Sequence, residues 1–284
     1  MRITISATPG VNSPMLEVLR DGLALRNIPQ DEQTPELCLA AVQRNGLALE
    51  YAGHKSEEIC ARALAQNGLA LEFVGDAPTP QQIEIALRQN GLALKFLPAR
   101  SAEQCLLAVQ HNGMALRLLT PQEKTPAICR AALRQCGEAL PYVPASLRTT
   151  EMYVLAVGNS VKAMGMIRPS ERSLEVCTAA IDHDPMALAW VPDELRSVEL
   201  CLRAVEKWSG AQQYVPAAIF SEVLIALAVR RNDPAEATAR MQSYYRHEPQ
   251  AALDVARRHG LDVQVVNPRP ASEVRANHPR QRGG

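Results

Sequence analysis

The sequence has few aromatic residues, no net charge and no long apolar run, and each absence excludes a class of protein. Phe, Trp and Tyr make up 4% of the 284 residues, and 30 Lys and Arg are balanced by 30 Asp and Glu. General binders of nucleic acid or membrane surfaces need a positive excess that this chain lacks. No stretch of about 18 uninterrupted apolar residues is present, so no membrane span is predicted. The abundant Ala and Leu favour helices in a soluble protein.

The motifs of common enzymes are missing too. The sequence contains no Walker loop, Rossmann fingerprint, nucleophile elbow, HExxH zinc motif or CxxC pair. It therefore predicts a non-enzymatic protein with no catalytic residue, no metal site and no cofactor. One alternative stays open, a helical-repeat enzyme or nucleic-acid-binding protein whose site lies in the divergent C-terminal part. Residues 230–284 contain ten Arg against six acidic residues.

What the chain does contain is an internal repeat that runs from about Thr34 to past Asn232. Two early copies read TPELCLAAVQRNGLALEYAG and SEEICARALAQNGLALEFVG. Self-similarity at a period of roughly 22–24 residues is typical of stacked arrays in which each unit contacts its neighbours. We take the Gly of the NG-like pair as the reference position of each copy. Successive copies place there Gly46, Gly68, Gly91, Gly113, Gly137, Val161, Pro185, Ser209 and Asp233.

Each copy carries the signals of a helix that starts and stops at fixed positions. Ser or Thr stands twelve residues before the reference in every copy, from Thr34 to Ser221, where it predicts an N-cap. Ala stands five residues before the reference throughout, which fits a close helix crossing. The Asn-Gly pair predicts a helix end with Gly in the left-handed conformation. A second, shorter helix follows, and the turns at Val161 and Pro185 are expected to differ because Gly is lost there.

These signals predict an all-α, right-handed helical-repeat solenoid of about nine two-helix units, each of roughly 22–24 residues, with divergent caps. A partial copy ending at Pro29 predicts the N-terminal cap, and two helices are expected at about 234–246 and 249–259. The predicted organisation is a disordered leader, an N-terminal cap half-repeat, the repeat array, a C-terminal cap and a disordered basic tail. Their bounds are 1–12, 13–33, 34–246, 247–266 and 267–284.

The alternation A-V-x-x-N-G-x-A-L, with an aromatic–aliphatic–Pro ending, resembles an uncharacterised family of short two-helix repeats. That family occurs in bacterial, protist and giant-virus proteins. The resemblance covers roughly residues 34–216 and is best from 34 to 144. It implies a helical solenoid and supplies no catalytic or ligand-binding residue.

Two ladders of like residues are predicted to be structural. A packing position eight residues before the reference holds Cys in six copies and Ile or Tyr elsewhere, and free Cys behaves as a small buried hydrophobe. Unpaired thiols also fit a reducing compartment. An Asn before the reference recurs five times and is expected to bond local backbone or the next copy. Cys136 stands in that Asn position, without an activating neighbour. The ladders consist of Cys38, Cys60, Cys105, Cys129, Cys177 and Cys201, and of Asn45, Asn67, Asn90, Asn112 and Asn232.

The candidate site lies two and three residues before the reference, where polar side chains vary from copy to copy. Variation at one solvated position beside a rigid core is how solenoids distinguish partners. The sequence therefore predicts a protein-binding scaffold with an unidentified protein partner, no membrane contact and no nucleic acid. Its location is the cytoplasm or, since MRITISATPGVNSP resembles the leader of a bacterial type III effector, a host cytosol reached without a cleaved signal peptide. The candidate partner-binding residues are Gln43, Arg44, Gln66, Arg88, Gln89, Gln110, His111, Arg134 and Gln135.

Overall fold

The computed structural model describes residues 13–75 and 77–261, and over these ranges the chain forms helices and turns without a strand. The chain divides into two compact units, Met1–Trp190 and Val191–Gly284. The predicted leader (1–12) and basic tail (267–284) lie outside the described residues. Within the described ranges, no helix has the length and apolar character needed to cross a membrane.

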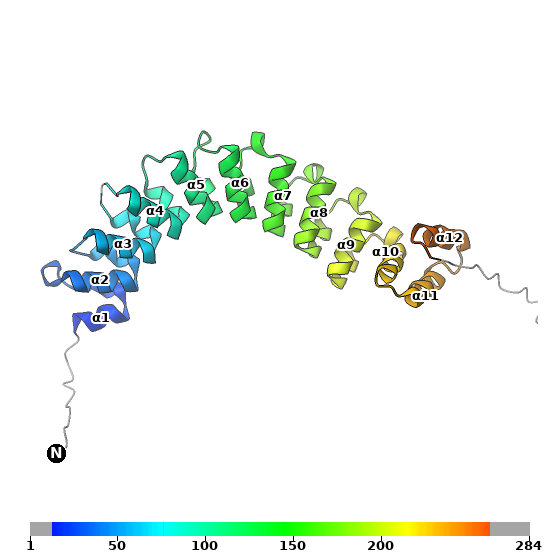
Figure 1. The fold of residues 1–284 in the computed structure, drawn as a ribbon, viewed down its shortest axis with the longest axis horizontal. Helices are drawn as coiled ribbons and strands as arrows, with labels where there is room; N and C mark the ends of the chain where they lie inside the picture. The colour runs from blue at the N-terminus through cyan, green and yellow to red at the C-terminus, as the bar shows by residue number, and fades with distance from the viewer. Residues whose placement is uncertain (1–12, 76, 262–284) are drawn as a thin grey trace, which may run out of the picture. The chain divides into compact units, whose positions relative to one another are not determined.

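The first unit is a stack of α-helices in which each packs on the next (Figure 1). After a shorter first helix, every helix has ten residues. The series is α1 (Pro14–Arg20), α2 (Pro35–Arg44), α3 (Glu57–Gln66), α4 (Pro80–Gln89), α5 (Ala102–His111), α6 (Pro126–Gln135), α7 (Thr150–Asn159) and α8 (Leu174–His183).

The second helix of each of the first eight copies is a six-residue 3₁₀ helix. Wherever another α-helix of the first unit follows it, this helix contacts the α-helix before it, the α-helix after it and the next 3₁₀ helix. The predicted shorter helix is therefore present, with the tighter 3₁₀ winding. In the first unit these helices are η1 (Gly22–Asn27), η3 (Gly46–Tyr51), η4 (Gly68–Phe73), η5 (Gly91–Phe96), η6 (Gly113–Leu118), η7 (Gly137–Tyr142), η9 (Val161–Met166) and η11 (Pro185–Trp190).

The loops between copies fall into a shorter and a longer group. The three copies at α3, α4 and α5, which we call the short copies, follow tight loops of five or six residues. The three at α6, α7 and α8, the long copies, follow loops of seven residues. A one-turn 3₁₀ helix forms in two of the long loops and in the loop before α2. These are η8 (Ala145–Leu147), η10 (Pro169–Glu171) and η2 (Gln30–Glu32).

The second unit keeps the repeat at its start and then departs from it. It contains η12 (Asp193–Leu195), α9 (Val198–Lys207), η13 (Ser209–Tyr214), α10 (Ala217–Arg230), α11 (Pro234–Tyr244) and α12 (Pro249–Arg258). Helices α11 and α12 occupy the two segments in which helices were predicted. Ile225, Met241 and Val255 join α10, α11 and α12 in one buried cluster.

The predicted N-cap at Ser221 is wrong. Helix α10 begins four residues earlier, after Pro216, and continues through Ser221, whose hydroxyl lies 2.9 Å from the Tyr245 hydroxyl. The apolar side chains that precede Ser221 extend the helix toward the N-terminus. Asp233 caps α11 and begins no 3₁₀ helix, so the ninth copy lacks the second helix of the repeat.

The other N-caps and the packing positions are confirmed. From Thr34 to Ser197, each predicted hydroxyl accepts a hydrogen bond from the backbone N–H three residues later. The repeated Ala is buried in every copy, and the six Cys of the ladder are buried as well. The sequence therefore placed both the helix starts and the core face correctly.

The reference glycines do not adopt the left-handed conformation, so that prediction is wrong. In the described part of the chain, positive φ occurs at Gly75, Gly260 and Asn232. The reference glycines are needed for a different reason, because they pack directly against the backbone of the next copy. A Cβ at Gly91 would overlap the carbonyl group of Ala108, and one at Gly46 would overlap the Ala63 carbonyl oxygen.

The turns at Val161 and Pro185 were expected to differ and do not. The preceding residue is extended in the first eight copies, with φ −147° and ψ 120° at Ser160 against φ −148° and ψ 112° at Asn45. Before Pro185, Asp184 has φ −145° and ψ 116°. The turn is therefore set by this extended residue, and Gly is not required to form it.

The predicted role of the Asn ladder is confirmed for four of its five members. The Oδ1 atoms of Asn45, Asn67, Asn90 and Asn112 each accept the backbone N–H two residues later, which caps the 3₁₀ helix. Asn232 is different, because it follows α10 with a positive φ of 56°.

Candidate functional site

The nine predicted site residues, which we call the polar stripe, all lie in the last turn of α2 to α6. Every one of them is exposed. They fall at the same end of five consecutive helices, because the repeat places them two or three residues before each reference glycine. The structure therefore brings them to one edge of the first unit, as the sequence predicted.

Three amides of the polar stripe also join neighbouring copies. Gln89 Oε1 accepts the Gly68 N–H at 2.6 Å, and its Nε2 donates to the Gln66 carbonyl oxygen at 3.2 Å. Gln66 and Gln135 accept the N–H groups of Gly46 and Gly113 in the same way. These glutamines hold the stripe at a fixed spacing, so part of their hydrogen-bonding capacity is already used.

The remaining members leave more of their polar groups at the surface. Arg88 forms an i,i+4 ion pair with Glu84 at 2.8 Å, with both side chains more than half exposed. Over the described ranges, no ion pair joins Arg44 or Arg134 to an acid. Gln43, Gln110 and His111 form no side-chain hydrogen bond to another described residue. The stripe therefore exposes three cationic side chains, and two of its five amides, Gln43 and Gln110, have no bond to other described residues.

The position of the polar stripe changes character after α6, in the copies at α7 and α8. Asn159 stands where Gln135 stands in the copy before and accepts the Gly137 N–H at 2.9 Å. Its Nδ2 donates to the Arg134 carbonyl oxygen at 2.9 Å. The next residue pair at this position is Asp182 and His183. The cluster of Arg and Gln is therefore confined to α2 to α6.

A second row of polar side chains, which the sequence did not lead us to expect, lies at the opposite end of the helices. We call these residues the loop-edge donors. Each stands in a loop, directly before an N-cap hydroxyl, and most of them bond backbone carbonyls of that loop or of a neighbouring 3₁₀ helix. Arg172 donates from Nε to the Ile167 carbonyl at 3.0 Å and from Nη1 to the Trp190 carbonyl at 2.8 Å. The row consists of Gln33, Lys55, Arg100, Lys124, Arg148, Arg172 and Arg196.

The loop-edge donors act mainly within the fold. Gln33 is buried and bonds the carbonyls of Ile28 and Tyr51, while its Oε1 accepts the Gly53 N–H at 2.8 Å. Lys55 reaches the Phe73 carbonyl at 2.8 Å. The sequence did contain a pattern that could have revealed this row, since a long side chain able to donate hydrogen bonds precedes the N-cap in all but one of these copies. Four of the donors bond the last carbonyl of the following 3₁₀ helix, which no local pattern indicates. Arg148 instead bonds the Val143 and Pro141 carbonyls that precede it.

Burial favours the neutral form of five of the six thiols in the ladder. Burial raises the pKa of Cys60, Cys105, Cys129 and Cys177, and it raises the pKa of Cys201 to about 11. Since the thiolate is the reactive form, these side chains act as packing groups. Across the described ranges, no three His, Cys, Asp or Glu side chains gather as a metal site would require.

Comparison with known proteins gives one partial match. Residues 34–77 match the family model described as Domain of unknown function (DUF4116). The matched segment spans α2, η3, α3 and η4, which are two consecutive copies of the repeat, and includes Gln43, Arg44 and Gln66 of the polar stripe. No curated protein and no solved structure matches the chain significantly.

Proposed function

We propose that this chain is a non-enzymatic scaffold that binds a protein partner along the polar stripe. The observation that carries the proposal is the alignment of nine exposed polar side chains at one edge of five stacked helices. Stacking makes this surface continuous, and elongated polar surfaces of this kind suit an extended segment of another protein.

The chemistry of the stripe favours a protein over nucleic acid. Five of its nine residues are Gln, whose amides donate and accept hydrogen bonds without a charge to desolvate. Arg44, Arg88 and Arg134 add guanidinium groups, which are enriched among residues that dominate binding energy at protein interfaces. Three cations spread over five copies give little of the dense positive field that a phosphate backbone requires.

The test is a charge reversal of the three arginines, R44E/R88E/R134E, used as bait beside the wild-type chain in host-cell and bacterial lysates. The partner is the protein that the wild-type chain captures and the variant loses. The matched control is R26E/R62E/R117E, which reverses three exposed arginines of the same unit at other positions of the repeat. Equal capture by both variants would assign the partner to another surface. A complex that weakens steeply with added salt would favour nucleic acid.

Two further proposals concern the cellular location of the chain and the family of its repeats. The buried, unpaired thiols support a reducing compartment, and together with the Ser/Thr-rich first residues they suggest a secreted bacterial effector acting in a host cytosol. A translocation reporter fused after the chain tests this, with loss of signal expected when the segment 1–12 is removed. The shared register supports placing the copies after residue 77 in the same repeat family as the matched segment.

A further inference from the structure

A cavity of about 430 Å³ lies between the N-terminal ends of α5 and α6, at the opposite end of these helices from the polar stripe. Helix α5 has ten residues, which separates its two ends by roughly 15 Å. The cavity is therefore a separate surface, and its occupant goes beyond the proposed function. Its volume falls in the ordinary range of ligand sites.

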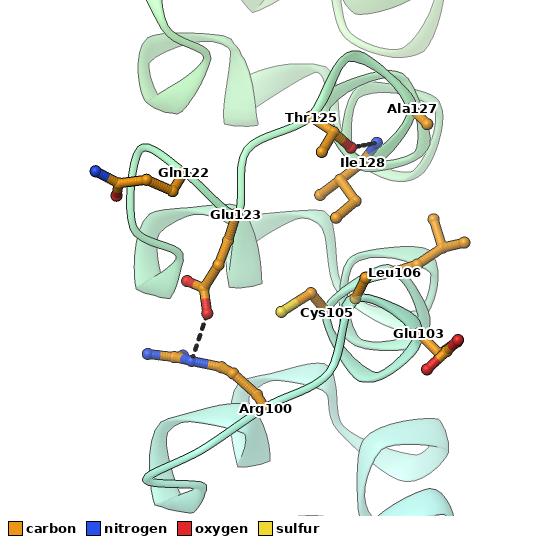
Figure 2. A pocket seen from close by; sticks show the side chains of 10 residues that line it. Arg100, Glu103, Cys105, Leu106, Gln122, Glu123, Thr125, Ala127 and Ile128 are labelled. Carbon is orange, nitrogen blue, oxygen red and sulfur yellow. Dashed lines mark hydrogen bonds and ion pairs between the residues drawn. The ribbon is translucent and has the colours of Figure 1, made fainter.

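The walls of the cavity are largely apolar. Figure 2 shows Ile128 of α6 facing Cys105 of α5, with Leu106 beside them. Ala102 and Ala127 are exposed at the N-terminal turns of the two helices, where small side chains leave the mouth open. Cys105 is 1% exposed and burial raises the pKa of its thiol, so it contributes a neutral wall.

The cavity is open because the side chain of Glu123 is held to one side of it. The Glu123 carboxylate is held away from the space between the helices, because its oxygens lie 3.2 Å from Arg100 Nε and accept the Thr120 N–H at 2.7 Å. One copy later the residue in the place of Glu123 is Leu147, an apolar side chain. One copy further, the small Cys of the ladder is replaced by the larger Tyr153, which is buried.

The rim carries an excess of negative charge. Arg100 is engaged with Glu123, and both side chains are largely covered. Glu103 lies on the other side of the cavity in the view of Figure 2 and is exposed, with its carboxylate accepting the Ser101 hydroxyl at 2.9 Å. Among the residues that the structure describes, no cation pairs with Glu103.

We propose that this cavity binds a bulky apolar side chain of a partner polypeptide that carries Lys or Arg at the next position. The apolar side chain replaces water against Leu106, Cys105 and Ile128, which is favourable in proportion to the area covered. The adjacent cation meets the unpaired carboxylate of Glu103. An acidic neighbour would face Glu103 with like charge, so the cavity selects basic-apolar segments.

The probe is the peptide acetyl-Gly-Trp-Lys-Gly-amide, titrated into the isotope-labelled full chain while methyl and backbone NMR signals are followed. Saturable shifts are expected for the methyl groups of Leu106, Ala127 and Ile128. The matched peptide with Ala in place of Trp should give none, and the one with Glu in place of Lys should bind more weakly. Absence of shifts up to about 5 mM, which detects even millimolar affinity, would overturn the proposal. Equal binding of all three peptides would do so too.

Two variants locate the site. Ala102→Leu narrows the mouth of the cavity and should abolish the NMR shifts. Leu is chosen because α8 carries it at the same first position, as Leu174. Thr150→Leu makes the same kind of change at the first position of α7 and should leave binding intact. Glu103→Gln should weaken the Lys peptide about two- to five-fold, the range of an exposed ion pair. Loss of binding in Thr150→Leu, or no effect of Ala102→Leu in a folded chain, would contradict the assignment.

Discussion

The short copies and the long copies of the first unit join their neighbours by different means. In the short copies the reference residues are Gly68, Gly91 and Gly113, each of which lies against the backbone of the next α-helix. In the long copies Gly remains at 137 and gives way to Val161 and Pro185. There Arg148 bonds the Val143 carbonyl of its own loop, and Arg172 also bonds the Trp190 carbonyl at the end of the following 3₁₀ helix. All three short copies thus use close backbone contact at a reference glycine, whereas two of the three long copies lack that glycine.

This difference predicts where the array tolerates substitution. A joint made by backbone contact leaves no room for a Cβ, because neither partner can move aside by changing a rotamer. A joint made by long side chains can lose one bond and keep its packing. Four substitution experiments, given from the largest expected effect to the smallest, test the comparison.

The largest effect is expected when Val is placed at a short-copy reference position. Gly91→Val would drive a side chain into the Ala108 carbonyl, and the cost should be about 3 kcal/mol, at the upper end of overpacking. The reciprocal change Val161→Gly should cost about 1 kcal/mol or less, from chain entropy and lost burial. Urea unfolding midpoints measure both. If the two changes cost the same, the joints are equivalent and the comparison fails.

A smaller effect is expected from the partner residue in the same joint. Ala108 is fully buried, and Ala108→Leu should destabilise the chain by about 1–3 kcal/mol through overpacking at the helix crossing. Ala127→Leu, at an exposed position, is the control and should be nearly neutral. A neutral result for Ala108→Leu would mean that the crossing has room for a larger side chain and that the packing face is wrongly assigned.

The loop-edge donors should contribute unequally in the two kinds of copy. Arg172→Met removes two hydrogen bonds and the stacking on Trp190, where the guanidinium lies 5.7 Å from the ring centroid, and should cost about 1–2 kcal/mol. Lys55→Met removes one exposed bond and should cost about 0.5 kcal/mol. Hydrogen exchange of the amides in η11 and η4 would show which of these helices each substitution destabilises. A larger loss of stability for Lys55→Met than for Arg172→Met would contradict the proposed difference between the long and the short copies.

The smallest effect is a pH dependence centred on a long-copy loop. Bonds from the Arg168 guanidinium and from Tyr153 lower the pKa of Glu171 from 4.5 to about 2. A carboxyl whose pKa is lower in the folded state stabilises it above pH 4.5, and this contribution is lost as the pH falls toward 2. The unfolding midpoints of the wild type and Glu171→Gln should therefore converge over that interval. A difference that stays constant from pH 7 to pH 2 would show that the carboxylate charge is not involved.

Much of this fold was predictable because its determinants are local and repeated. The N-cap residues, the buried Ala and the Cys of the ladder each recur at one position of the repeat, so their recurrence indicates that this position has the same environment in many copies. The prediction failed where the determinant was a contact in space. The role of the reference glycines depends on the next copy, and the start of α10 depends on the apolar residues after Pro216, which override the Ser221 signal.

The candidate site was predictable to a more limited extent. The register placed the polar stripe at one edge, yet the sequence did not show that Gln66, Gln89 and Gln135 bond the preceding copy. The loop-edge donors were hidden because the carbonyls that four of them reach belong to the following 3₁₀ helix, distant along the chain. The cavity at α5 was hidden because it results from the orientation of a single side chain, Glu123.

The contact between reference glycine and alanine also bears on how such a chain can change its length. Every short copy carries both halves of the joint, a glycine for the following neighbour and an alanine for the preceding one. Excision of residues 91–112 would leave Asn90 joined to Gly113, with the surfaces on both sides still matched. Duplication of the same segment would likewise create no new kind of interface. The array can therefore gain or lose copies of the repeat by recombination within the gene, while the contacts that pack one copy on the next stay the same.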